Sequence, residues 1–121
     1  MDTKNLKGLT VEEIWATLQH DSCVLRGKVG VGKVALLRRL AEEKGLLLVD
    51  VRLDQLSAGF LPSDLLPMLR AQEQPTLILF EGLDRCSREV KEITEDILGD
   101  RVIHGLVLNS DVYLIATETI N

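Results

Sequence analysis

Aromatic side chains are scarce in this sequence: they make up 3% of its 121 residues, whereas 45% of the residues are hydrophobic. With so few rings, a core of this chain must be built from Leu, Val, Ile and Ala. Such an aliphatic core suits strands covered on both faces, where each strand reads as a continuous apolar run. A chain of this length can bury one hydrophobic core but not two. We therefore expect a single domain over residues 1–121.

An excess of positive charge is also missing. The net charge is −5 and the pI is near 5.0. Nucleic-acid binders gain affinity by neutralising phosphates with Lys and Arg, so this charge argues against a nucleic-acid partner. The N-terminus has no apolar run of a signal peptide, and no stretch reaches membrane-spanning length. We expect a cytoplasmic protein without a membrane partner. Cys23 and Cys86 lack metal-ligand spacing, and we expect both to be reduced.

Apolar runs alternate with helical periodicities along the chain. Residues 1–9 are polar, and we expect them to be flexible. A leading helix over 10–20 then opens with Thr10 and Glu13 at capping-box spacing. The patterns predict strands at 22–26, 46–51, 76–80 and 111–117, helices at 33–45, 63–72 and 87–98, and a small hairpin over 101–108. Strands alternating with helices imply an α/β fold with a parallel sheet.

A glycine-rich turn separates the strand at 22–26 from the helix at 33–45. Its residues are Gly27, Lys28, Val29, Gly30, Val31, Gly32, Lys33 and Val34. Glycines let backbone N–H groups approach a ligand, and the N-terminus of the following helix adds positive potential, so the turn suits a polyphosphate. Lys33 supplies a charge for the terminal phosphates. We therefore predict that these eight residues bind ATP or ADP. The alternative is a glycine-rich turn with an incidental lysine.

Val34 stands where a phosphate-binding loop of this pattern has Ser or Thr. Valine has nearly the shape of threonine, so the loop can keep its conformation. The hydroxyl that would hold Mg²⁺ is nevertheless missing. Backbone amides and Lys33 can bind phosphates without it. The sequence therefore supports nucleotide binding more firmly than it supports Mg²⁺ binding.

The segment TLILFEGLDR, residues 76–85, is a buried strand with acidic residues at its carboxyl end. Together with the glycine-rich turn, it resembles the core of an AAA+ ATPase, most closely the MoxR-type members. The family's pattern here is an apolar run followed by Asp-Glu, an apolar residue, Asp or Asn, and Arg. Leu83, Asp84 and Arg85 match the end of that pattern. The following helix and hairpin, and a strand ending in Ile-Ala-Thr, extend the resemblance over residues 22–119.

The sequence departs from the family's pattern at the metal-binding and catalytic positions. Without gaps, Glu81 stands at the position of the metal-binding Asp, and Gly82 at that of the catalytic Glu. A shift by one residue makes Glu81 the catalytic acid and leaves Phe80 at the metal position. One carboxylate is missing either way. Glu81 is thus a candidate metal ligand, or a residue that meets only solvent or Arg85. The family's polar sensor residue falls at Thr119.

The resemblance implies a three-layer, P-loop NTPase-like sandwich with a short, mainly parallel sheet in the strand order 5-1-4-3-2. The chain ends at Asn121, so we expect it to lack the family's helical lid, arginine finger and fifth strand. The segment 22–26 would then be an edge of the sheet. An unpaired edge is a template for another chain. The implied partners are further copies of this chain or a full-length AAA+ ATPase.

Two functions remain open at this point. The first is a nucleotide-binding P-loop protein with weak or no hydrolysis, because metal ligation and water activation are both impaired. The alternative is a catalytically inactive AAA+-like assembly or regulatory protein. Gly27, Gly32 and Lys33 favour the first, whereas Val34 and Gly82 favour the second as far as catalysis is concerned. We assign no catalytic residue. A fragment of a longer ATPase would carry the same changes in its motifs.

Overall fold

The computed structural model describes residues 1–5, 7–28, 32–56, 74–103 and 105–120. Its elements in chain order are β1 (Asp2–Asn5), α1 (Val11–Leu18), β2 (Cys23–Gly27), α2 (Lys33–Lys44), β3 (Leu47–Arg52), a short 3₁₀ helix (Leu53–Gln55), β4 (Thr76–Glu81), α4 (Arg88–Asp100), β5 (Val102–Ile103), β6 (Leu106–Val107) and β7 (Val112–Thr119). The helix predicted at 63–72 lies outside the described residues. The other predicted elements are confirmed, with ends that differ by one or two residues.

Five strands form one parallel sheet in the order β1-β2-β7-β4-β3. Four of them, β2, β7, β4 and β3, follow the strand order that the AAA+ resemblance implies. The fifth position, beside β2, is occupied by β1 from the N-terminus. β5 and β6 pair separately as the expected antiparallel hairpin.

β1 overturns two expectations drawn from the sequence. We expected residues 1–9 to be flexible and residues 22–26 to form a sheet edge, but Asp2–Asn5 pair with β2 along their whole length. The N–H of Asp2 also donates to the carbonyl of Ser22 at 2.8 Å. An unpaired strand edge offers backbone hydrogen bonds to any extended segment within reach, which explains why so polar a segment is a strand. The premise for self-association through the 22–26 edge is therefore wrong.

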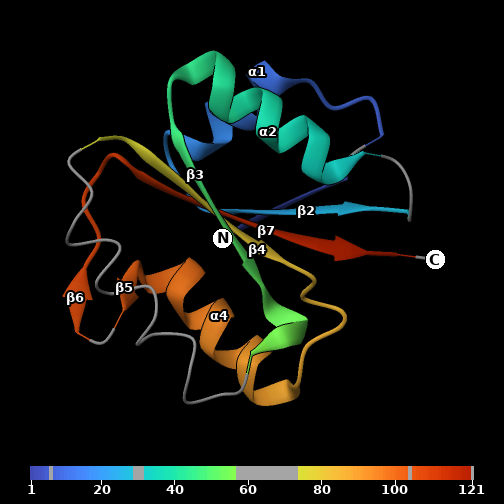
Figure 1. Ribbon diagram of the computed structural model, residues 1–121, viewed down its shortest axis with the longest axis vertical. Coiled ribbons are helices and arrows are strands. Elements are labelled where there is room, and N and C mark those ends of the chain that lie inside the picture. Colours follow the sequence, from blue (N-terminus) through green and yellow to red (C-terminus); the bar gives the residue numbers. More distant parts are fainter. Residues whose placement is uncertain (6, 29–31, 57–73, 104, 121) are drawn as a thin grey trace.

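Helices cover both faces of the sheet. α1 and α2 lie on one face and α4 on the other (Figure 1). The side chains of β4 alternate between the two layers, as a strand requires: Leu77 and Leu79 pack in the α1–α2 core, and Ile78 and Phe80 pack in the α4 core. All four are fully buried. Within the described part of the chain, each helix is too short or too polar to cross a lipid bilayer.

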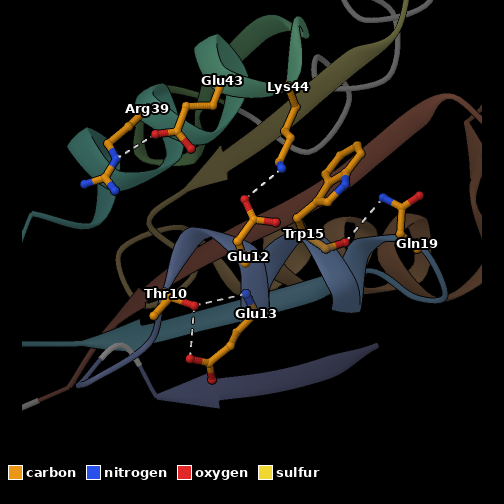
Figure 2. A network of polar contacts seen from close by, with 8 residues as sticks. All are labelled: Thr10, Glu12, Glu13, Trp15, Gln19, Arg39, Glu43 and Lys44. Atoms are coloured by element: carbon orange, nitrogen blue, oxygen red, sulfur yellow. Dashed lines mark hydrogen bonds and ion pairs between the residues drawn. The ribbon is translucent and has the colours of Figure 1, made fainter.

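The predicted start of α1 at Thr10 is confirmed: Thr10 is the N-cap, and its side chain bonds Glu13 (Figure 2). The Oγ1 of Thr10 accepts a hydrogen bond from the N–H of Glu13 at 3.2 Å and donates one to its Oε1 at 3.0 Å. Such a cap contributes about 1 kcal/mol to helix stability. It also fixes where α1 begins, and so which of its side chains face α2.

Contacts between α1, α2 and β7 position the helix that follows the glycine-rich turn. Lys44 Nζ, in the last turn of α2, pairs with Glu12 Oε1 of α1 at 2.8 Å (Figure 2). The same ammonium lies 5.8 Å from the centre of the Trp15 ring, within the range of a cation–π contact. Trp15 packs in turn on Tyr113 of β7, with ring centres 4.9 Å apart. Trp15 is half-buried at the edge of the α1–α2 core, and its contacts anchor α2 against the sheet.

Candidate functional site

The glycine-rich turn joins a buried strand to a helix, as predicted. β2 ends at Gly27 and α2 begins at Lys33, while residues 29–31 lie outside the described residues. Gly32 precedes the helix with φ 78° and ψ 32°, a left-handed conformation that suits glycine. The described ends of the glycine-rich segment, Gly27 and Gly32, thus lie at the end of β2 and at the N-terminus of α2.

The N-terminus of α2 differs from those of α1 and α4. Thr10 and Ser87 each accept a hydrogen bond from a first-turn N–H at 3.2 Å, whereas Gly32 has no side chain that could do so. Uncapped N–H groups, together with the helix dipole, attract anions. Of the three helices that the structure describes, α2 is therefore the one suited to a phosphate.

Lys33 folds back over the turn. Its Nζ donates to the carbonyl oxygens of Gly27 and Lys28, each at 3.1 Å. Both acceptors are neutral backbone groups, and an ammonium carries three donors. A phosphate oxygen is a stronger, charged acceptor than a carbonyl. The side chain can thus exchange these contacts for a bound phosphate.

On the other side of β7, strand β4 ends at Glu81 and the chain turns at Gly82. Gly82 has φ 94°, and its N–H donates to Oγ1 of Thr117 at 3.2 Å. The next N–H, of Leu83, donates to the carbonyl of Thr117 at 2.9 Å. Thr117 is buried and is the register partner of Glu81. It therefore ties the end of β4 to β7 and fixes where Glu81 stands.

Glu81 lies beside a second carboxylate, that of Asp50 on the neighbouring strand β3. Burial raises the pKa of Glu81 above its usual value of 4.5, and Asp50 raises it further, whereas Arg52 and Arg85 lower it. Among the described residues, no group of three His, Cys, Asp or Glu side chains is arranged to hold a metal ion. Val34 adds no hydroxyl. This donor set does not fit a magnesium site built from the chain's own side chains.

The ends of β4 and β7 and the start of α2 surround a hollow of about 270 Å³. It lies at the carboxyl ends of the parallel strands, where open α/β sheets bind their ligands. In Figure 1 this is the side to which the arrowheads of β2 and β7 point. The hollow is lined by Gly32, Lys33, Val34, Ala35, Glu81, Arg85, Thr117 and Thr119.

The hollow brings together several residues singled out from the sequence. Lys33 and Val34 come from the turn, Glu81 from β4 and Thr119 from the end of β7. The backbone N–H of Thr119 donates to Oδ1 of Asp84 at 2.9 Å, so this strand end is also fixed. The binding role of each of these residues stays a prediction.

Three further residues at the site were not given a role by the sequence analysis: Asp50, Arg85 and Thr117. The carboxyl ends of parallel strands meet at one edge, so an acid near the end of the 46–51 run and a threonine closing Ile-Ala-Thr were visible signals. Arg85 is exposed, and its place in the lining of the hollow had no such signal, because it depends on the backbone turn at Gly82.

β2 is followed by the glycine-rich segment and then by α2, and β4, with its acidic end, lies two strands away from β2 in the parallel sheet. This arrangement is an α/β fold of the P-loop NTPase class. The order of β2, β7, β4 and β3 is that of the AAA+ fold. Solved structures with a similar fold include those of RuvB of Thermotoga maritima, an AAA+ ATPase.

Three RuvB structures illustrate the likeness. A lysine-to-arginine mutant has a TM-score of 0.63 and 18% identity, covering 91% of this chain and 38% of that one. The RuvB Holliday junction branch migration motor has a TM-score of 0.61 and 17% identity, and the match covers 90% of this chain and 37% of the RuvB chain. An alanine-to-serine mutant has a TM-score of 0.61 and 17% identity, covering 97% and 42%. This chain thus spans about two fifths of their length, and the likeness concerns the fold. No protein-family model and no curated protein sequence matches the chain.

Proposed function

We propose that the chain binds ATP or ADP in the hollow between α2, β4 and β7, with weak or no hydrolysis. The observation that carries this proposal is the placement of Lys33 and the uncapped N-terminus of α2 on one wall of the hollow. The phosphates would accept hydrogen bonds from the first-turn N–H groups and from the Lys33 ammonium. The AAA+ type of the fold supports the same assignment.

Hydrolysis requires groups that this site lacks. Position 34 has no hydroxyl and position 82 has no carboxylate, and water activation and charge stabilisation each account for orders of magnitude in rate. We expect phosphate release at background even in the triple variant Val34→Thr, Glu81→Asp, Gly82→Glu. A glutamate at position 82 would inherit φ 94° and would meet the Arg85 guanidinium. Robust phosphate release that disappears with Lys33→Met would contradict this expectation.

Two finer assignments stay predictions. The residues Leu83, Asp84 and Arg85, together with the strand ending in Ile-Ala-Thr, support a resemblance to MoxR-type AAA+ proteins. The proposed protein partners are further copies of the chain or a full-length AAA+ ATPase. Because β1 covers β2, such a partner would have to use another surface than the 22–26 edge.

Nucleotide binding is tested by calorimetric titration of the whole chain with ATP, ADP and adenosine. We expect saturable binding of both nucleotides with one site per chain, and much weaker binding of adenosine, because phosphates supply the main contacts. Binding of ATP should also raise the melting temperature by mass action. No heat of binding and no thermal shift at millimolar ATP or ADP would contradict the proposed function.

A further inference from the structure

Arg85 reaches the hollow through the turn at the end of β4. The backbone N–H of Arg85 donates to the carbonyl of Gly82 at 3.0 Å, which closes the turn. A Cβ at position 82 would lie 3.4 Å from both Nε and Nη2 of Arg85. The guanidinium thus lies against the bare backbone of Gly82, and Arg85 lines the hollow together with Lys33 and Glu81.

Several arginines of the chain have a carboxylate partner, which Arg85 lacks among the described residues. Arg26, Arg39 and Arg88 each donate through Nε to a glutamate at 2.9–3.1 Å. The described residues include no ion-pair partner within 4.0 Å and no hydrogen-bond acceptor for the Arg85 guanidinium. The charge of Arg85 lowers the pKa of Glu81, but the two side chains form no ion pair. A guanidinium carries five donors, and the described residues leave those of Arg85 to a ligand.

The position of Arg85 depends on Gly82. The left-handed φ of 94° favours glycine, and any larger side chain at 82 would press on the guanidinium. Glycine at position 82 therefore makes room for a cation beside the end of β4. Lys33 and Arg85 line the hollow from opposite sides of β7, and among the described lining residues Glu81 carries the one carboxylate. This leaves the lining with an excess of positive charge.

We propose that Arg85 is a phosphate-binding residue of the hollow, which together with Lys33 neutralises the terminal phosphates of a nucleoside di- or triphosphate where a metal ion would otherwise do so. The inference rests on the proposed function. A guanidinium offers two parallel donors to phosphate oxygens, and it needs no metal ligand from Val34 or Gly82. Affinity should therefore grow with the number of phosphates and should not require a divalent cation.

The test compares Arg85→Gln with Arg88→Gln by calorimetric titration of the whole chain with ATP and with AMP, in buffer containing EDTA. The control removes the same charge three residues away, from a side chain that is 90% exposed on α4. We expect Arg85→Gln to weaken ATP binding about 10- to 100-fold and AMP binding less than about threefold. Arg88→Gln should change either affinity less than about twofold. Arg85→Lys should recover part of the ATP affinity, since it restores the charge without the planar donors.

The outcomes separate this inference from the proposed function. If the unmodified chain binds ATP and Arg85→Gln binds it as tightly as Arg88→Gln does, Arg85 is not a phosphate ligand while the proposed function stands. An equal loss for ATP and AMP would likewise overturn the inference, because it would show a structural role. If the unmodified chain binds neither nucleotide, the proposed function fails and this inference fails with it. Unchanged melting temperatures of the variants show that they are folded.

Discussion

The strands on either side of β7 end in different ways, although residues that follow β2 and residues at the end of β4 line the same hollow. β2 runs through a glycine-rich turn into α2 and offers backbone N–H groups and the Lys33 ammonium. β4 ends in Glu81, beside a second acid and near two arginines, and then turns at Gly82. The β2 side is equipped to hold an anion. The β4 side lacks a carboxylate that metal-dependent hydrolysis would use.

The difference follows from what each side is made of. Anion binding at β2 depends mainly on backbone geometry, which replacement of threonine by the similarly shaped Val34 leaves intact. Metal binding and water activation depend on particular side-chain oxygens, and neither Val34 nor Gly82 can supply one. A P-loop domain can therefore lose catalysis while it keeps phosphate binding. Each of the following experiments alters one side of this comparison.

The largest effect is expected on the β2 side, from Lys33→Met. Removal of a charged donor from the phosphate site should weaken ATP binding by about 100-fold. Lys7→Met, which removes an exposed lysine ahead of α1, serves as the control and should bind as the unmodified chain does. Calorimetric titration measures both. Equal ATP affinity of the two variants would remove the distinction between the strand ends.

Deletion of residues 2–5 also acts on the β2 side, because it uncovers the edge of the strand that carries the turn. The ladder between β1 and β2 and the 2.8 Å pair between the N-terminal ammonium and Asp21 would be lost or displaced. We expect a loss of about 2–4 kcal/mol in the free energy of unfolding and concentration-dependent self-association. Urea unfolding and light scattering over a dilution series measure these effects. The control, Thr3→Ser with Asn5→Ser, alters two exposed side chains and keeps the strand.

On the β4 side, Gly82→Ala should destabilise the fold by about 1–3 kcal/mol, because alanine is strained at φ 94° and its Cβ would press on Arg85. The matched control is Gly99→Ala in α4, where no atom lies within 4 Å of the added Cβ. That change should instead stabilise the helix by about 0.5–1 kcal/mol. Urea unfolding of both variants tests the pair. Destabilisation by both would show that the turn at Gly82 has no special role.

The smallest effect concerns the acid on the β4 side. Because the pKa of Glu81 is raised in the folded chain, folding favours its protonated form. This contribution to stability is fully present below about pH 4.5 and is lost as the pH rises through the raised pKa. Glu81→Gln should remove the decline, whereas Glu89→Gln, an exposed change on α4, should keep it. Melting temperatures measured from below about pH 4.5 to above the raised pKa show whether each variant keeps the decline in stability. Identical pH profiles for Glu81→Gln and the unmodified chain would contradict a raised pKa of Glu81 in the folded chain.

Local patterns were enough to predict most of the fold. The aliphatic runs at 46–51 and 76–80 and the glycine stop at Gly45 correspond to β3, β4 and the end of α2. β1 could not be predicted, because DTKN has no apolar pattern and becomes a strand only by pairing with β2. In the site, the turn and Lys33 follow from the motif itself. The neighbourhood of Glu81 depends on strand register and on the backbone turn at Gly82, which no local pattern encodes.

The central claim is that phosphate binding persists without a metal site, and the ratio of ATP affinities with and without Mg²⁺ tests it most directly. Calorimetric titrations of the unmodified chain with ATP would be run in excess MgCl₂ and in EDTA, in otherwise identical buffer. We predict that the two dissociation constants agree within about threefold, because Lys33, Arg85 and the backbone of α2 supply the contacts. ATP binding that is tighter in Mg²⁺ by tenfold or more, with the gain lost in Glu81→Gln, would contradict the account.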